Sequence, residues 1–332
     1  MTGESVLIEH IFNSVMDLTL KGHYEIAMGF MKKNEVHKYP ECFQLYENLA
    51  EKMLNKRDGV NYASLASLRD LLLELMKHMK SQNGVEQGEV TAQKIERCLY
   101  ACHFEALYLA LGISYEKVRQ QQPSMNAAAF VSLSNRLNTL KLRIKVGSLR
   151  YIWPVLPDKA FFEAGNACKV HFIFIVIQLI YIKFSGTEYE SMAVIFFRYL
   201  RDILDAIDEN DPNFVDNGLF EGTDVPTSYD LPPNKYLTNG EEEEVKQWLS
   251  DVSVEHDGGK LRLDDNRECY EASAKGGNHA NVLPVCVISG RNLGNGLFAT
   301  RGDWATFIQL ALHFACEEIS DVHVFLTKWA EP

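Results

Sequence analysis

The apolar residues of this chain recur at the spacing of an α-helix over most of its length, and this periodicity is the strongest limit on its fold. In the segment 62–80 they follow one another at steps of three and four residues, which places them on one helical face: Leu65, Leu68, Leu72, Leu75 and Met79. Segments 125–146 and 188–209 repeat the pattern. Each segment therefore predicts an amphipathic helix whose apolar face packs against a neighbour.

Short breaks separate these helical segments. They fall at Gly22, at Tyr39-Pro40, between Gly84 and Gly88, at Pro123 and at Gly147. Connections of this length join antiparallel neighbours. Over residues 1–209 we therefore predict a mostly α-helical fold, an antiparallel array of the tetratricopeptide-like α-solenoid kind. A strict repeat signature is not visible, so the repeats of such an array are degenerate.

Residues 210–240 lose the helical pattern. They contain four prolines and three glycines among acidic residues: Pro212, Pro226, Pro232, Pro233, Gly218, Gly222 and Gly240. This composition is typical of a linker that crosses the surface as an irregular strap. Residues 241–254 then predict one more helix, because the run Glu241–Glu244 stands in its first turn, where negative charge is favourable.

The tail, residues 241–332, changes in character and predicts a second, small core of mixed α+β type. Three of the four tryptophans lie in it. The apolar run Leu283–Gly290 ends in a glycine turn and predicts a strand. Asp303 is placed to N-cap a helix that carries Trp304, and a last helix is expected over about 318–329.

Val170–Ser185 is the most apolar run of the chain and has three interpretations. A membrane-spanning helix needs about 20 apolar residues, whereas these sixteen include Gln178 and Lys183. A buried strand or helix is the second interpretation. We favour the third, a short retained intron, because AT-rich codons dominate the run and its first codon supplies the GT of a donor site. Joining Lys169 to Gly186 would restore one continuous helix, and sequencing the transcript decides the question.

The charge and the cysteines exclude several classes of function. The net charge of −12 repels phosphate backbones and anionic bilayers, so we expect no nucleic-acid partner and no direct membrane insertion. The seven cysteines are scattered and odd in number. They are typical of reduced thiols in a cytosolic compartment and do not form a disulfide framework.

No arrangement of side chains in the sequence predicts catalysis or metal binding. Cys98, Cys102 and His103 lack the second pair of ligands that a closed zinc site needs. The two cysteines stand four residues apart on an apolar face, as core residues do. The tail has no Cys-x-x-Cys pair, and Cys286 has no neighbouring histidine to act as a base. We therefore expect a non-enzymatic protein without catalytic residues, metal or cofactor.

Several longer motifs carry a resemblance to a known family. They are Pro157–Gly165, Phe196–Asp208, Asp224-Val-Pro226, Glu243–Trp248 and Tyr270–Ser273. In this order they resemble the C-terminal part of the intraflagellar transport protein 172 family, whose members are large subunits of the train-B complex. The resemblance implies a scaffold or adaptor in cilium assembly, maintenance and tip turnaround. It also implies a place in the cilium or flagellum and basal body, with a cytoplasmic pool.

The tail of that family resembles a U-box, the zinc-free relative of the RING fold. The resemblance implies a surface for ubiquitin or another partner made of five residues: Val287, Ile288, Leu293, Trp304 and Ile308. Its implied partners are other train subunits, ubiquitin or a ubiquitin-conjugating enzyme, and microtubule end-binding proteins. The loop 291–302 is short, rich in glycine and without proline, which argues against ligase activity. Ubiquitin binding needs only a modest apolar patch.

Two alternatives from other classes stay open at this point. In the first, the chain is a U-box-type ubiquitin ligase, and Ile288→Ala should then reduce ubiquitin transfer to background. Otherwise it is a helical coat or tethering protein outside cilia, which an organism without cilia would favour.

Overall fold

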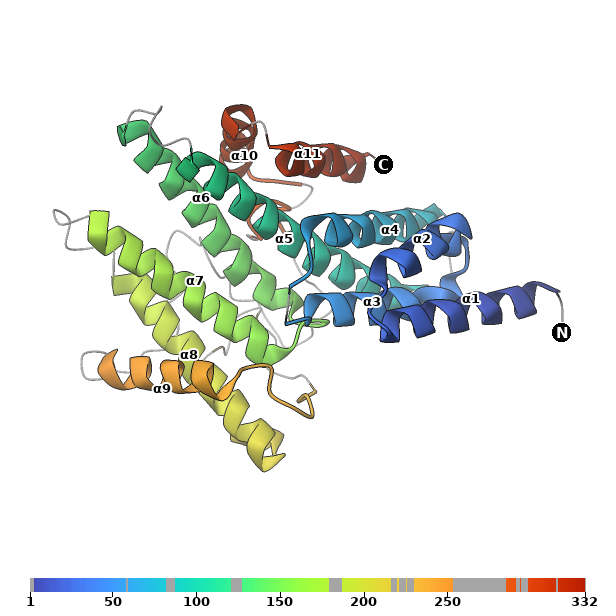
Figure 1. Cartoon of the computed structure of the whole chain (residues 1–332), viewed down its shortest axis with the longest axis horizontal. Coiled ribbons are helices and arrows are strands. Elements are labelled where there is room, and N and C mark those ends of the chain that lie inside the picture. The colour runs from blue at the N-terminus through green and yellow to red at the C-terminus, as the bar shows by residue number, and fades with distance from the viewer. Residues whose placement is uncertain are drawn as a thin grey trace. The chain divides into compact units, whose positions relative to one another are not determined.

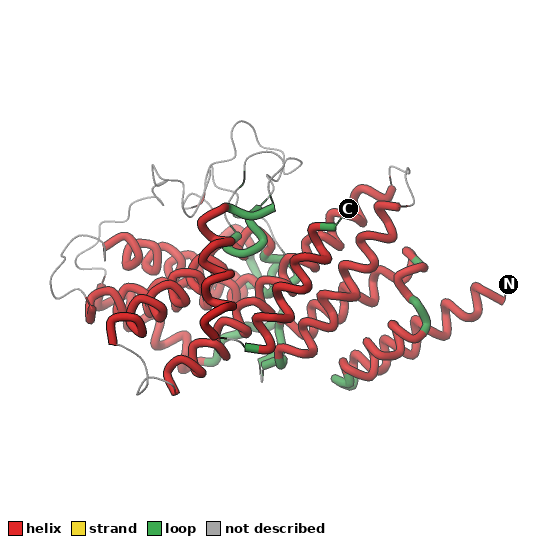
Figure 2. The backbone as a smooth tube through the Cα atoms, turned by 90° about the horizontal axis from the view of Figure 1, so that it is seen from above, coloured by secondary structure: helices red, strands yellow, loops and turns green. Residues whose placement is uncertain are grey.

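The computed structural model describes most of the chain, in the following residues: 3–57, 59–81, 87–120, 127–178, 187–215, 220, 225, 230–252, 285–290, 293, 298–314 and 316–331. Within this part the regular structure is helical and contains no β-strand, as Figures 1 and 2 show. This agrees with the predicted mostly α-helical array.

The α-helices are α1 (Gly3–Leu20), α2 (Tyr24–Lys33), α3 (Phe43–Leu54), α4 (Tyr62–Ser81), α5 (Gln87–Gln120), α6 (Ala127–Gly147), α7 (Pro157–Gln178), α8 (Thr187–Glu209), α9 (Asn239–Val252), α10 (Arg301–Phe314) and α11 (Glu317–Ala330). Short 3-10 turns accompany them: η1 (Val36–Lys38), η2 (Pro40–Cys42), η4 (Ser148–Tyr151) and η5 (Pro212–Phe214).

The chain divides into two compact units. Unit 1 comprises residues 1–113, 153–155 and 316–332, and unit 2 comprises residues 114–152 and 156–315. The last helix, α11, therefore belongs with the first helices of the chain, whereas α10 belongs to unit 2.

Helix α4 supplies much of the core of unit 1. The backbone N–H of Ser64 donates to the Asn61 side chain at 2.8 Å, and this bond fixes the start of the helix. The leucines of its apolar face are buried as the periodicity predicted: Leu65, Leu68, Leu72 and Leu75. Met79, at the end of the same stripe, is half-buried.

Helix α11 is attached to α4 by a buried cation. Arg69 has no exposed surface, and its guanidinium donates to Asp70 and to Asp321, both at 3.1 Å. The same group lies 3.8 Å from the ring centre of Phe325, so the ring face completes its surroundings. A buried charge is tolerated only when it is paired, and α11 supplies one of the two carboxylates that pair with this arginine.

The C-terminal end of α11 is tied to α4 and α5 as well. Lys77 donates to the carbonyls of Lys328 and Glu331, at 2.7 and 3.0 Å, where the helix dipole is negative. Trp329 packs against Tyr100 and His103 of α5, with ring centres 4.9 and 5.3 Å apart. Polar and aromatic contacts together hold this end of α11 in place.

Asp321→Asn should lower the free energy of unfolding by about 1–3 kcal/mol, because it leaves the buried Arg69 with one carboxylate. Urea unfolding of the full chain measures the change. Glu317→Gln, an exposed acid on the same helix, is the control and should cost less than about 0.5 kcal/mol. Equal losses in the two variants would contradict the role given to the Arg69 pair.

Unit 2 is built on the pair α7 and α8, with α9 packed on α8 (Figure 1). Its centre is a set of four buried aromatic rings with neighbouring ring centres 4.6 to 6.2 Å apart: Phe161, Phe196, Tyr199 and Phe220. Beside them Gly165 permits a close approach of the two helices. A Cβ at this position would lie 2.5 Å from the ring of Phe197. That ring is itself held by Trp248 of α9, with ring centres 5.2 Å apart.

Gly165→Ala should therefore destabilise unit 2 by about 1–3 kcal/mol, since the added methyl group has no room beside Phe197. Thermal unfolding followed by circular dichroism measures the effect. Gly302→Ala is the matched control, because a Cβ there meets no atom within 4 Å. A variant at Gly165 that melts no earlier than the control would show that α7 and α8 are less tightly packed than described.

The described residues of the predicted linker 210–240 lie on unit 2. Phe220, Val225 and Leu237 are buried in its core. Asp158, in the first turn of α7, accepts the backbone N–H of Tyr236 at 2.6 Å. Burial raises the pKa of Asp158, while the backbone donors around it act in the opposite direction. This carboxylate thus fastens the end of the linker to the start of α7.

Lys235 continues this attachment toward α8 and α9. Its ammonium group bonds Asp208 at 2.5 Å and Glu242 at 2.9 Å. Burial would raise the pKa of Glu242, but hydrogen bonds from Lys246 and Lys235 outweigh this effect and lower it. One lysine therefore connects three elements.

The apolar run Val170–Ser185 is described only in part. Helix α7 continues to Gln178, and residues 179–186 lie outside the described residues. The hypothesis of a retained intron stays a prediction. None of the helices in the described part is both long and apolar enough to cross a membrane.

The strand predicted over Leu283–Gly290 is wrong in its described part. From Val287 to Ser289 the chain forms a turn, which the bond from Gly290 N–H to the Cys286 carbonyl closes at 2.8 Å. Gly290 has φ +71°, and a Cβ on it would lie 2.9 Å from the Cα of Gly147. A short apolar run does not by itself define a strand. Here the positive φ of Gly290 and its close backbone contact with Gly147 go with a turn. The predicted α+β, U-box-like tail is not supported.

Candidate binding surfaces

The residues of the predicted ubiquitin-binding surface lie in unit 2 in two different environments. Val287, Ile288 and Leu293 are buried. Trp304 and Ile308 are half-buried on α10. Of these five residues, only the two on α10 are partly open to solvent.

A buried carboxylate explains why the 285–290 segment packs inward. Asp303 accepts hydrogen bonds from Ser289 Oγ at 2.6 Å and from Thr300 Oγ1 at 2.7 Å. Arg143 of α6 donates to its other oxygen at 3.2 Å. The thiol of Cys286 lies 3.5 Å away. These bonds place the apolar side chains beside them in the core.

The N-cap of α10 is a different residue from the one predicted. The backbone N–H of Asp303 donates to Thr300 Oγ1 at 3.0 Å, so Thr300 caps the helix and Asp303 stands three residues inside it. The Thr300 hydroxyl in turn donates to the Asp303 carboxylate, so two hydrogen bonds join residues that stand at the spacing of a capping box. The prediction that Asp303 is the N-cap was wrong, because its carboxylate is used to hold the turn.

The described cysteines are suited to packing. Burial is the main cause that raises the pKa of the Cys286 thiol, and it also raises the pKa of Cys98 and Cys102 in α5. A thiol with a raised pKa is a poor nucleophile and a poor metal ligand at neutral pH. In the part of the chain that the structure describes, no group of three or more His, Cys, Asp or Glu side chains is placed to hold a metal ion.

Helix α10 presents an apolar stripe that the sequence prediction included only in part. Trp304, Ile308 and Leu312 stand four residues apart, and Leu312 is 76% exposed. We call these three residues the α10 stripe. The helical spacing from Ile308 was the signal that could have added Leu312 to the predicted surface.

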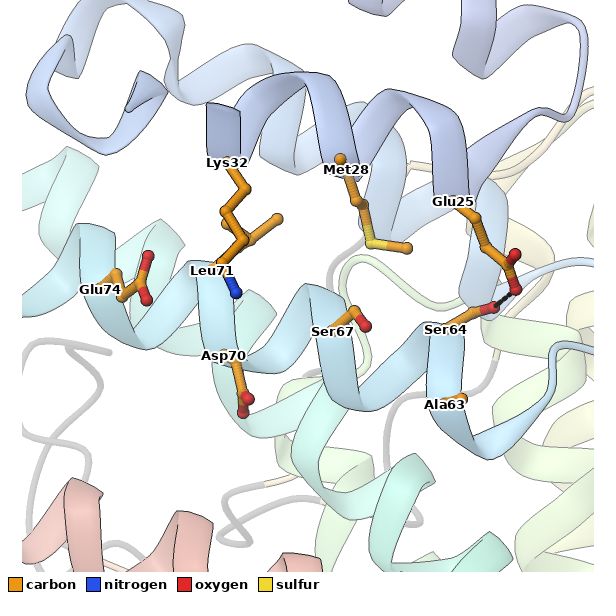
Figure 3. A pocket seen from close by; sticks show the side chains of 10 residues that line it. Glu25, Met28, Lys32, Ala63, Ser64, Ser67, Asp70, Leu71 and Glu74 are labelled. Atoms are coloured by element: carbon orange, nitrogen blue, oxygen red, sulfur yellow. Dashed lines mark hydrogen bonds between the residues drawn. The ribbon is translucent and has the colours of Figure 1, made fainter. Parts of the chain in front are cut away.

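A second surface, which sequence reasoning missed, is a pocket of about 440 Å³ between α2 and α4. We call it the α2–α4 groove, and Figure 3 shows the side chains that line it. Helix α2 contributes Glu25, Met28, Gly29 and Lys32, and helix α4 contributes Ala63, Ser64, Ser67, Asp70, Leu71 and Glu74. The spacing within each helix was visible in the sequence, but the pairing of the two faces was not.

The floor of the α2–α4 groove is apolar and its rim is polar. Met28 and Leu71 are buried, while Gly29 and Ser67 are exposed. At one end Ser64 Oγ donates to Glu25 at 3.1 Å, a bond that Figure 3 draws. Such a groove can hold an apolar side chain, and its polar rim can orient the molecule that carries it.

The acids of the groove are only partly neutralised. Asp70 shares Arg69 with Asp321, so one guanidinium serves two carboxylates. Glu74 lies 3.9 Å from His37, which carries charge only when protonated. Glu25 bonds a neutral hydroxyl. With Lys32 as the cation that lines the groove, the field inside it is negative.

Together these features define a class of protein. The described residues form a helical array with an open groove and an exposed apolar stripe, the kind of architecture that helical scaffold proteins use to bind others along their surface.

Comparison with known proteins finds particular proteins that resemble this chain. No protein-family model matches the chain. It is 25% identical to the intraflagellar transport protein 172 homolog of Danio rerio over 335 residues, which cover 98% of this chain and 17% of that protein. It is 26% identical to the intraflagellar transport protein osm-1 of Caenorhabditis elegans, covering 88% of this chain and 15% of that protein. Intraflagellar transport protein 172 of Chlamydomonas reinhardtii is 23% identical, over 87% of this chain and 16% of that protein.

The chain is thus similar, over nearly its whole length, to proteins named intraflagellar transport protein 172. It spans less than a fifth of the length of these relatives.

Proposed function

We propose that the chain is a non-enzymatic scaffold module of the intraflagellar transport train. The observation that carries the proposal is the match of 98% of the chain to relatives named for this transport. In this role it serves the assembly and maintenance of cilia and the turnaround at the ciliary tip. It is placed in the cilium or flagellum and the basal body, with a cytoplasmic pool.

The structure supports a scaffold through the way its surfaces are made. Among the described residues many apolar side chains are buried in the two cores, while the α2–α4 groove and Leu312 of the α10 stripe are open to other molecules. The proposed partners are other subunits of the train and microtubule end-binding proteins. A helical coat or tethering protein outside cilia is the alternative that the experiment below separates.

A fluorescent tag fused after Pro332 at the chromosomal locus tests the scaffold function. The product should concentrate in cilia and move along them at the speed of other train subunits imaged in the same cell. If the product stays outside cilia in ciliated cells, the scaffold function is wrong and the chain is a coat or tethering protein.

Ubiquitin binding is a second proposed function, and the α10 stripe is the observation that favours it. The 76% exposure of Leu312, next to the half-buried Ile308, provides the modest apolar patch that this binding requires. The buried Val287 and Ile288 support the stripe from within unit 2 in this proposal. A ubiquitin-conjugating enzyme is proposed as a further partner only if the chain supports ubiquitin transfer and Ile288→Ala abolishes that transfer.

Leu312→Ser should weaken the binding of isotopically labelled ubiquitin at least about tenfold, because it removes the most exposed apolar side chain of the α10 stripe. Nuclear magnetic resonance titration with the full chain gives the affinity and the contacted face of ubiquitin. Val131→Ser, at a side chain of 40% exposure on α6, is the control and should leave the affinity unchanged. Titration without any shift in the unmodified chain would end the proposal.

A further inference from the structure

The α2–α4 groove contains unused space beside a helix backbone. Gly29 lies in the middle of α2, where glycine costs about 1 kcal/mol relative to alanine. A Cβ at this position would meet no atom within 4 Å, so packing does not demand the glycine. Across the groove, α4 presents the small exposed side chains of Ala63 and Ser67. Small residues on both walls let a further backbone approach closely.

The shape of the space favours a helix as its occupant. The groove runs between two neighbouring helices, and its walls have no bulky side chain at Gly29, Ala63 or Ser67. Beneath them Met28 provides a flexible and polarisable floor next to Leu71 (Figure 3). An amphipathic helix that lays its apolar face into such a groove is a common mode of recognition.

The charge of the rim selects among such helices. Glu25 and Glu74 are exposed at opposite ends of the groove, and Asp70 between them is only partly matched by Arg69. A helix with acidic flanks would be repelled, whereas lysines or arginines beside its apolar face would meet carboxylates.

We propose that the α2–α4 groove docks an amphipathic helix of another protein, with an apolar side chain over Gly29 and Ser67 and basic side chains against Glu25, Asp70 and Glu74. The inference adds a specific binding mode to the proposed scaffold function and stands on the groove itself. Its test is therefore made in vitro and does not depend on where the chain acts in the cell.

The probe is a fluorescent synthetic peptide of about 15 residues, roughly 22 Å long as a helix, with leucines on one face and lysines on the other. Fluorescence anisotropy with the full chain gives its affinity. Gly29→Leu fills the groove from α2 and should weaken binding about tenfold or more. Gly302→Leu, at another helical glycine with open space around its Cβ, should leave binding unchanged.

The charge of the groove is tested separately. Glu25→Gln with Glu74→Gln should weaken binding several-fold at low salt while Asp70 continues to pair with Arg69. Glu209→Gln with Glu243→Gln removes the same charge from exposed positions in unit 2 and is the control. A peptide with glutamate in place of lysine should bind at least about tenfold more weakly to the unmodified chain.

Three results would overturn the proposal: no binding of the lysine peptide, equal binding by the two peptides, or equal effects of a groove variant and its control. Circular dichroism establishes that Gly29→Leu folds, and its melting temperature should not fall. If it does fall, Ser67→Met fills the groove from α4 and gives the same test. If these variants lose peptide binding but ciliary transport stays normal, the docking site exists but is not needed for the proposed scaffold function.

Discussion

The burial of Arg69 is the constraint around which unit 1 is arranged. A guanidinium that cannot reach water must find its counter-charges inside the protein, and this one takes them from Asp70 and Asp321, with the face of Phe325 beside it. Two of these three partners lie on α11, at the far end of the sequence. The position of α11 along α4 is thereby fixed, and the contacts of Lys77 and Trp329 follow from it.

Unit 2 uses buried carboxylates for a related purpose. Asp158 and Asp303 both stand in the first turn of a helix, and each binds a segment that lies outside the helices. The aromatic rings around Phe220 then supply the apolar contact that the polar bonds orient. Helix starts therefore serve as attachment points for the parts of the chain that are not helical.

The sequence predicts the helices of this protein well, because their apolar spacing is a local property. Leu65, Leu68 and Leu72 are buried on one face as expected. The 285–290 turn could not be predicted in the same way, since its conformation depends on Asp303 and on contact with Gly147. Thr300 and Asp303 did form a recognisable capping box in the sequence. The α2–α4 groove required the pairing of two separate helix faces, which no local pattern contains.

The attachment of α11 to α4 has a consequence for genetics. A stop codon before Glu317 removes two of the three partners of Arg69, Asp321 and Phe325, so its effect falls on a helix encoded more than two hundred residues earlier. C-terminal deletions that remove α11 also disturb the core around α4. Their effects would therefore be assigned wrongly to the end of the chain. Mutations in these two distant stretches should instead produce the same structural defect.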